Sequence, residues 1–288
     1  MKAPSTSMFG LLARNAATGI LIRRGPSSHT QLIKWNLAKD TFEEGQWFKG
    51  RIYERRCDIS PNGTLLIYFA ATYKEPLRSW TAISKPPWFT ALALWPKGDG
   101  WNGGGRFLDS YSIQLNHLPN EATPHPDFVS GCRKFRVAAW ADDRGEDNTV
   151  WHALLNRGQW KFAQRGVWSE YEETKGIAWK ALKPEVWRKP HPKVNIQLEM
   201  AIEAIGHRNF RWYYVNYRLL DAALAERLNL GVLDWAEWDS EGDLLYAKGG
   251  CLFRQGVSAR KVSVPRQLAD FSSNRFKAIP APPAATKL

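Results

Sequence analysis

The sequence predicts an all-β, mainly antiparallel fold, and three observations carry this prediction. Short runs rich in Val, Ile, Tyr, Trp and Phe recur between clusters of Gly, Pro, Asn and Asp. Each run has the length of a typical strand, about four to eight residues, and is too short for most helices. A strand–turn–strand pattern also repeats along the chain. Its 288 residues suffice for one large domain or two ordinary ones.

The predicted strands follow one another along most of the chain. They cover residues 20–23, 31–36, 46–53, 64–70, 90–95, 135–140, 150–155, 160–164, 211–218, 244–247 and 251–254. Residues 219–228 (LLDAALAERL) have helical composition and spacing, which predicts a helix inserted between strands. A second helical candidate, around residues 178–187, is interrupted by Pro184.

The repeat is clearest in CDISPNGTLLIYFA, from Cys57, and WAEWDSEGDLLYAK, from Trp235. Placing Gly63 over Gly242 also places Ser60 over Asp239. Both copies predict a strand, a four-residue turn that closes on glycine, and a second strand. Glycine suits the left-handed backbone position at the end of such a turn, which other residues adopt at a cost.

Strand–turn–strand units that repeat Trp, Gly and Asp about every 40 to 50 residues are typical of a β-propeller. A four-stranded blade has two apolar faces, so it must stack on its neighbours, and closing the ring protects the strand edges. The spacing predicts about five or six four-stranded blades. The alternative is a two-sheet sandwich with long loops.

In these features the sequence resembles propeller proteins in general, including Trp-Asp repeat, sialidase-like and five-bladed glycoside hydrolase folds. The runs RRGPSS, GQWFKGRIYERRCDISPNG and LALWPKGDGWNGGG are also similar to runs in bacterial hypothetical proteins, a resemblance that implies no function. We expect residues 1–7 to be a flexible lead, 8–279 a single propeller-like domain, and the Pro/Ala-rich residues 280–288 a disordered tail.

Composition excludes a membrane span, because no run approaches the 18 or so apolar residues that one needs. The first residues are too polar for a secretion signal. Cys57, Cys132 and Cys251 have no metal-binding spacing and leave one thiol unpaired, which predicts a cytoplasmic protein. The chain is basic, with a net charge of +12, and contains 15 tryptophans.

A basic strand in GQWFKGRIYERRCD is the first candidate binding site. Strand alternation places Tyr53 and three cationic side chains on one face and Arg56 on the other. Guanidinium groups beside an aromatic ring suit phosphate, carboxylate or a nucleic-acid backbone. The alternative is a polar outer strand neutralised by neighbouring acids. The candidate residues are Lys49, Arg51 and Arg55, with Arg23 and Arg24 brought near by a Gly-Pro turn.

The second candidate is the stretch from Lys175 to Lys193, where six basic residues face one acid, Glu185, for a local charge of +5. Interleaved aromatic and basic residues suit an acidic protein surface, and they also suit single-stranded nucleic acid. The alternative is a solvated loop whose tryptophans pack inward. The candidate residues are Trp179, Lys180, Trp187, Arg188 and Lys189.

The glycine-rich loop PKGDGWNGGGRF contains a G-x-G-x-x-G match at Gly98, Gly100 and Gly103. A dinucleotide fingerprint must open a helix, whereas FLDSYSIQL, which follows, predicts a strand. We therefore expect a loop between blades. Three of its side chains, Lys97, Trp101 and Arg106, would then line a pocket.

Carboxylates provide the enzymatic alternative, because paired acids about 5 to 10 Å apart can hydrolyse glycosidic bonds. The residues considered are Asp58, Asp109, Asp142, Asp234 and Glu203. Asp58 and Asp239 also occupy positions where turns use Asp for backbone hydrogen bonds. The six histidines lack ligand spacing and no G-x-S-x-G is present, so we expect no metal, no cofactor and no catalytic residue.

These observations predict a non-catalytic binding platform for an acidic protein partner or for nucleic acid, with no membrane contact. The alternative is a central-channel hydrolase similar to the five-bladed glycoside hydrolases.

Overall fold

A computed structural model describes residues 6–25, 28–140, 145–173, 176–206 and 212–288. The prediction of an all-β protein is confirmed, with 48% strand, 10% helix and several antiparallel sheets. The chain forms two compact units. The N-terminal unit comprises Gly10–Leu154 and Arg275–Leu288, and the C-terminal unit comprises Met1–Phe9 and Leu155–Asn274.

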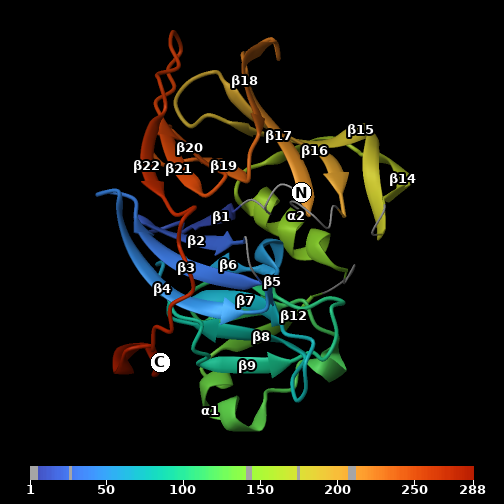
Figure 1. Ribbon diagram of the computed structural model, residues 1–288, viewed down its shortest axis with the longest axis vertical. Coiled ribbons are helices and arrows are strands. Elements are labelled where there is room, and N and C mark those ends of the chain that lie inside the picture. Colours follow the sequence, from blue (N-terminus) through green and yellow to red (C-terminus); the bar gives the residue numbers. More distant parts are fainter. Residues whose placement is uncertain (1–5, 26–27, 141–144, 174–175, 207–211) are drawn as a thin grey trace. The chain divides into compact units, whose positions relative to one another are not determined.

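The first three sheets follow one another along the chain (Figure 1). The first has the order β1 (Ser7–Leu12), β2 (Thr18–Arg24), β3 (His29–Asn36), β4 (Thr41–Lys49). The second has the order β5 (Arg51–Ile52), β7 (Leu66–Ala71), β8 (Ser79–Ser84), β9 (Ala93–Pro96), with β6 (Asp58–Ile59) also paired to β7. The third has the order β10 (Gly105–Phe107), β11 (Ser112–Leu115), β12 (Arg136–Ala139), of which β11 and β12 are parallel.

Short helices fill the connections. They are η1 (Glu54–Arg56), η2 (Pro119–Glu121), η3 (Pro126–Phe128), α1 (Val129–Cys132), α2 (Asp147–Arg157) and η4 (Pro283–Ala285).

The sheets of the N-terminal unit pack on one another in chain order. Phe48 of β4 lies 5.7 Å, between ring centroids, from both Trp80 and Phe89, which joins the first sheet to the second. The second and third sheets share one apolar core, to which Ile67 of β7 and Phe107 of β10 both belong, each with no exposed surface. Burial of such side chains is the main favourable contribution to folding.

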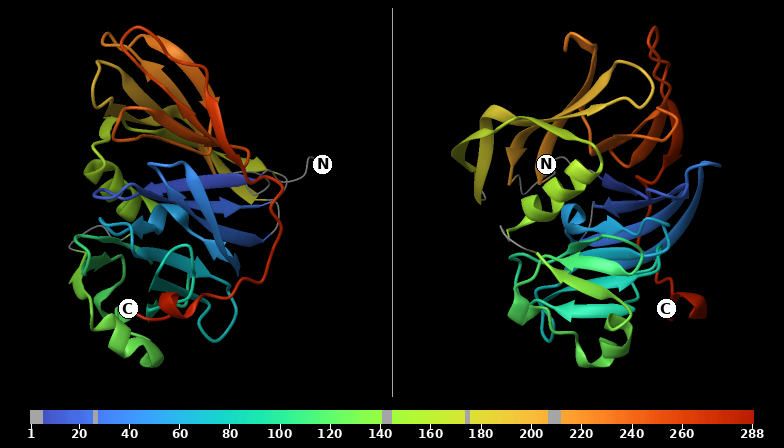
Figure 2. Two further views of the ribbon diagram at one scale, coloured as in Figure 1. Left: turned by 90° about the vertical axis from the view of Figure 1, so that its left-hand side faces the viewer. Right: turned by 180° about the vertical axis from the view of Figure 1, so that it is seen from behind.

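The C-terminal unit contains two further sheets, drawn from yellow to red in Figure 2. One has the order β13 (Lys161–Gln164), β15 (Gly176–Pro190), β16 (Gln197–Ile205), β17 (Tyr213–Leu220), β18 (Glu226–Val232), with β14 (Val167–Glu173) also paired to β15. The other has the order β19 (Trp235–Trp238), β20 (Leu244–Lys248), β21 (Cys251–Gln255), β22 (Arg266–Asp270).

The two copies of the repeat form the same turn. Gly63 has a φ of 74° and Gly242 a φ of 96°, so both occupy the predicted left-handed position. Ser60 Oγ accepts hydrogen bonds from two backbone N–H groups just after the turn. Asp239 Oδ1 accepts three, two within the turn and one just after it. A short polar side chain thus closes the turn in both places, which explains why Ser60 and Asp239 align.

The helix predicted at residues 219–228 is wrong. β17 ends at Leu220 and β18 begins at Glu226, and Leu219 pairs with Leu228 across the hairpin. Asp221 Oδ1 accepts N–H groups within the turn, a local bond that competes with helix formation. The helical candidate around residues 178–187 is also wrong, because these residues lie in β15.

The strand predicted at residues 150–155 is wrong in the opposite sense, because this segment lies within helix α2. Asp147 in its first turn and Arg157 in its last have the charges that the helix dipole favours. Val150, Trp151 and Leu155 are buried at a helical spacing. A short apolar run does not distinguish these two structures by itself.

The first and last described residues make tertiary contacts. Thr6 is buried, and its hydroxyl donates to the carbonyl of Ser272 within the C-terminal unit. Residues 280–288, whose composition predicts disorder, contain η4, bury Ala285 and place Leu288 against the core of the N-terminal unit.

Candidate functional site

The glycine-rich loop between β9 and β10 is held from beneath by Arg56. This side chain is 2% exposed, forms an ion pair with Asp147, and donates through Nη1 to the carbonyls of Gly100 (2.8 Å) and Asn102. Charge-assisted bonds of this kind are among the strongest in proteins. The segment predicted to be one flexible loop is therefore fixed at two of its peptide groups.

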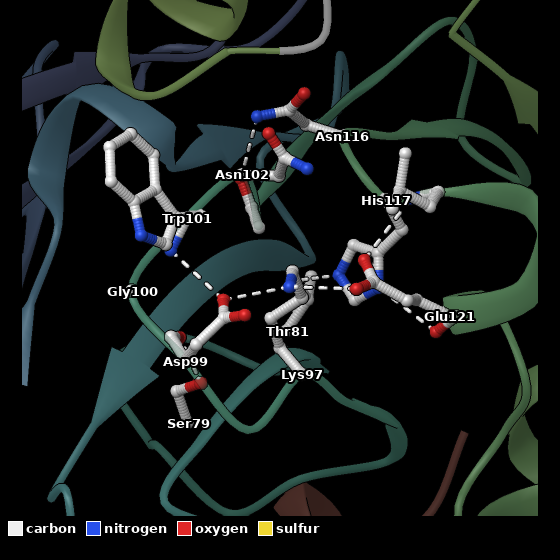
Figure 3. Close-up of polar contacts among 12 residues, drawn as sticks. Ser79, Thr81, Lys97, Asp99, Gly100, Trp101, Asn102, Asn116, His117 and Glu121 are labelled. Atoms are coloured by element: carbon white, nitrogen blue, oxygen red, sulfur yellow. Dashed lines mark hydrogen bonds and ion pairs between the residues drawn. The ribbon is translucent and has the colours of Figure 1, made fainter.

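Lys97 also holds this loop, through Asp99 (Figure 3). Its side chain is 1% exposed, and Nζ lies 2.7 Å from Asp99 Oδ1 and 3.1 Å from Glu121 Oε1. Asp99 Oδ1 also accepts the backbone N–H of Trp101 at 3.0 Å. The carboxylate therefore closes a tight turn from which the Trp101 side chain projects.

His117 bonds to Thr81 of β8, and Thr81 in turn bonds to the loop, as Figure 3 helps to follow. Its Nδ1 lies 3.2 Å from the carbonyl oxygen of Glu121, and its Nε2 lies 2.8 Å from Thr81 Oγ1. A carbonyl only accepts, so Nδ1 carries the proton; in the neutral ring, Nε2 then accepts from the threonine hydroxyl. Thr81 Oγ1 in turn accepts the N–H of Gly104 at 2.7 Å.

A hydroxyl beside a neutral imidazole has the composition of a nucleophile and its base. Thr81 has no exposed surface and His117 is 3% exposed, so no substrate reaches either group in this structure. The pair therefore holds Gly104 and the glycine-rich loop in place.

His117 makes stability depend on pH. Burial lowers its pKa from 6.5 to about 4. Between these values the unfolded chain binds the extra proton, so stability falls as the pH falls from 6.5 towards 4, by about 3 kcal/mol in all. We expect denaturant midpoints to decrease over this interval, and His117→Gln to remove most of the decrease. If His125→Gln, at a part-exposed ring, removes as much of it, the assignment to His117 is wrong.

Above this support lies a surface of aromatic and cationic side chains, all within the N-terminal unit. Trp101 is 67% exposed and Tyr73 is 52% exposed. The glycine-rich loop packs close to Tyr73: a Cβ added to Gly100 would lie 3.1 Å from Tyr73 Oη. The hydroxyl groups of Tyr73 and Tyr53 are hydrogen-bonded to each other. We call this set the Trp101 surface; it comprises Arg24, Arg51, Tyr53, Tyr73 and Trp101.

Two arginines complete the Trp101 surface. The guanidinium of Arg51 lies 4.6 Å from the ring centroid of Tyr53, a cation–π contact. Burial lowers the pKa of Arg24, the nearby Glu54 carboxylate raises it and the positive charge of Arg51 lowers it, so both charged groups lie close to Arg24. Arg24 thus lies near Arg51, and the binding role expected of both residues stays a prediction.

The other residues of the first predicted set are dispersed, because residues 46–56 do not form one strand. β4 ends at Lys49, which is exposed, and η1 turns Arg55 and Arg56 into the protein. Arg55 is buried with its guanidinium 4.9 Å from the Trp151 ring centroid. Arg23 has no exposed surface and donates to the carbonyl of Gly25.

The second predicted set lies on β15 in the C-terminal unit. These residues form a strand and not the solvated loop of the alternative interpretation. Trp179 and Lys180 are exposed. Trp187 is buried, as the structural alternative expected, and Lys189 pairs with Glu237 at 2.8 Å. Arg188 pairs with Glu199 at 2.7 Å.

The candidate carboxylates satisfy local hydrogen bonds. Asp58 is buried and accepts the N–H groups of Ile59 and Phe107. Asp109 is exposed, and hydrogen bonds from Tyr111 and Ser112 lower its pKa to about 2, whereas an acid catalyst needs a raised pKa. Asp234 accepts the N–H of Gly249 and Glu203 accepts from Asn216, whereas Asp142 lies outside the described residues.

The strand pattern does not predict that Arg56 is buried beneath the glycine-rich loop, because it continues the strand through residues that form η1. Its signal was the run Glu54–Arg56, in which consecutive charges end the apolar pattern. Among the residues that the structure describes, no three His, Cys, Asp or Glu side chains are grouped to hold a metal ion. None of the helices in this part of the chain has the length and apolarity that crossing a membrane requires.

No family model matches the chain, and the search of curated proteins finds no match. The geometry of the Trp101 surface is therefore the basis for the functional proposal.

Proposed function

We propose that the protein is a non-catalytic binding platform for an acidic protein partner, which it holds through the Trp101 surface. The observation that carries the proposal is an exposed tryptophan on a loop that the buried side chains of Arg56 and Lys97 hold in place. Tryptophan, tyrosine and arginine are the residue types that contribute most to protein interfaces. A side chain that is already ordered loses less conformational entropy when a partner binds.

Charge supports an acidic partner. The chain carries a net charge of +12, Arg51 lies over the ring of Tyr53, and Arg24 lies close to Arg51 and Glu54. Carboxylates of a partner would pair with these guanidinium groups while its apolar atoms pack on Trp101. The same chemistry accommodates single-stranded nucleic acid, so nucleic acid is the other outcome of the binding test.

The test is the binding of a labelled poly-glutamate peptide and a labelled oligo-dT, followed by fluorescence anisotropy. We expect the wild-type protein to bind the peptide more tightly and Trp101→Ala to weaken that binding about tenfold or more, as truncation of an interface hot spot does. Affinity should fall as salt rises, because ion pairs are screened. If the protein bound oligo-dT more tightly than the peptide, the proposed partner would be nucleic acid and not an acidic protein.

The matched control is Tyr111→Ala, which removes another exposed aromatic ring from the same unit. The proposal expects this variant to bind as the wild type does. If Trp101→Ala bound the peptide as tightly as wild type, the Trp101 surface would not be the binding site, however tight that binding was.

The proposal includes the finer fold, a propeller of about five blades. Its support is that the described residues form five sheets in succession and that the second and the fifth contain the same Gly-closed turn. Small-angle X-ray scattering provides the test, since a closed ring predicts one compact particle, whereas two separately tumbling units predict a larger radius of gyration.

We also propose that the protein works in the cytoplasm. Cys57, Cys132 and Cys251 are all free, as a reducing compartment favours. Fractionation of cells that produce the protein tests this location.

A further inference from the structure

A buried carboxylate in the C-terminal unit holds two arginines in one row. Glu199 on β16 has no exposed surface, and it lies between Arg188 on β15 and Arg218 on β17 in the strand register. Residues paired across antiparallel strands point to the same face of the sheet. Arg188 Nε donates to Glu199 Oε2 at 2.7 Å, and Arg218 Nε donates to Glu199 Oε1.

Both arginines bind Glu199 through Nε, which leaves the paired Nη groups at the end of each guanidinium for another acceptor. The side chains are 30% and 44% exposed, respectively. Among the described residues, the contacts of Arg188 comprise no acceptor besides Glu199. Nη1 of Arg218 lies 3.7 Å from Glu226 Oε2, beyond hydrogen-bond distance.

The row carries more positive charge than Glu199 neutralises, because one carboxylate faces two guanidinium groups. Glu226 is 44% exposed, so water screens its attraction for Arg218. Glu199 also fixes the direction of both side chains before any ligand arrives. Ordered, partly exposed guanidinium groups are preorganised donors for an oxyanion.

The geometry points to a binding site for a phosphate group at Arg188 and Arg218, with Glu199 as the positioning residue. Strands two apart in a sheet are separated by about 9–10 Å, so the ligand must bridge two side chains that approach from opposite sides. A tetrahedral phosphate offers oxygens to both guanidinium groups, whereas a carboxylate fits one of them bidentately.

A neighbouring side chain adds an acceptor. Asn216 lies two residues before Arg218 on β17 and therefore on the same face. Its Oδ1 is buried without a hydrogen-bond partner among the described residues, while Nδ2 donates to Glu203 at 3.3 Å. A hydroxyl on a singly protonated phosphate would satisfy this oxygen. The site lies outside the Trp101 surface and goes beyond the proposed function.

The test is isothermal titration of the full chain with inorganic phosphate and, separately, with O-phosphoserine. We expect wild-type protein to bind at least one of them, and Arg188→Gln and Arg218→Gln each to weaken binding tenfold or more. Tighter binding of O-phosphoserine identifies a phosphate group carried by a larger molecule, and tighter binding of inorganic phosphate identifies the free ion. Binding of neither ligand to wild type overturns the inference.

Three further variants separate this site from general effects. Arg165→Gln removes an exposed cation from the same unit and should bind phosphate as wild type does. Arg188→Lys keeps the charge but loses the paired donors, so it should lose most of the affinity, and full retention would overturn the two-arginine site. Trp101→Ala should keep phosphate binding, so a failure of the proposed function and a failure of this site give different results. Far-ultraviolet circular dichroism verifies that each variant is folded.

Discussion

Replacing Arg56 with methionine is expected to lower the free energy of unfolding by about 3–5 kcal/mol, the usual cost of leaving a buried charge without its partner. The variant leaves Asp147, whose side chain is 10% exposed, without its guanidinium. It also removes the Nη1 donor from the carbonyls of Gly100 and Asn102. Urea denaturation followed by tryptophan fluorescence measures the loss.

The matched control is Arg136→Met, which breaks another Arg–Asp pair in the same unit. Arg136 Nη2 lies 3.2 Å from Asp109 Oδ2, but the two side chains are 81% and 54% exposed. An exposed pair contributes about 0–1 kcal/mol, because water already solvates both charges. Equal losses in the two variants would show that Arg56 does not hold the loop as described.

Replacing Gly104 with alanine is the second change with a large expected effect. Gly104 has a φ of 77°, and an added Cβ would lie 2.2 Å from the carbonyl oxygen of Arg56. The left-handed backbone costs about 1–2 kcal/mol for an alanine, and the forced shift of a packed backbone adds about 1–3 kcal/mol. Thermal unfolding should show a clear decrease in Tm, together with weaker binding through the Trp101 surface.

Gly98→Ala provides the control from the same loop. Gly98 has a φ of 85°, but nothing lies within 4 Å of an added Cβ. It therefore carries the backbone cost alone, about 1–2 kcal/mol. A loss at Gly98 that equals or exceeds the loss at Gly104 would contradict the close packing between this loop and η1.

Local chemistry made several elements predictable. The turns at Gly63 and Gly242 are predicted by a glycine that follows a short polar side chain, because turns of this kind depend mainly on local sequence. The hairpin from β17 to β18 was not predictable in this way, because its leucines have helical spacing. Leu219 is buried and pairs with the half-buried Leu228 in the sheet, so tertiary contacts override local propensity.

The candidate site was partly predictable. The basic strand and the turn before it indicate Arg24 and Arg51 as binding residues, whereas Trp101 is expected only to line a pocket in the glycine-rich loop; all three belong to the Trp101 surface. The buried support was not predictable, because the ion pair between Arg56 and Asp147 joins residues that are 91 positions apart. Lys97 was noted as a pocket residue, whereas the structure buries it between two carboxylates.

The return of Arg275–Leu288 to the N-terminal unit determines when that unit is completed during synthesis. Phe276 lies 4.8 Å from the ring of His29 and 6.3 Å from that of Trp47, between centroids. Residues 275–288 are synthesised only after the whole C-terminal unit has been translated. Phe276 therefore cannot cover the rings of His29 and Trp47 until that unit has been made.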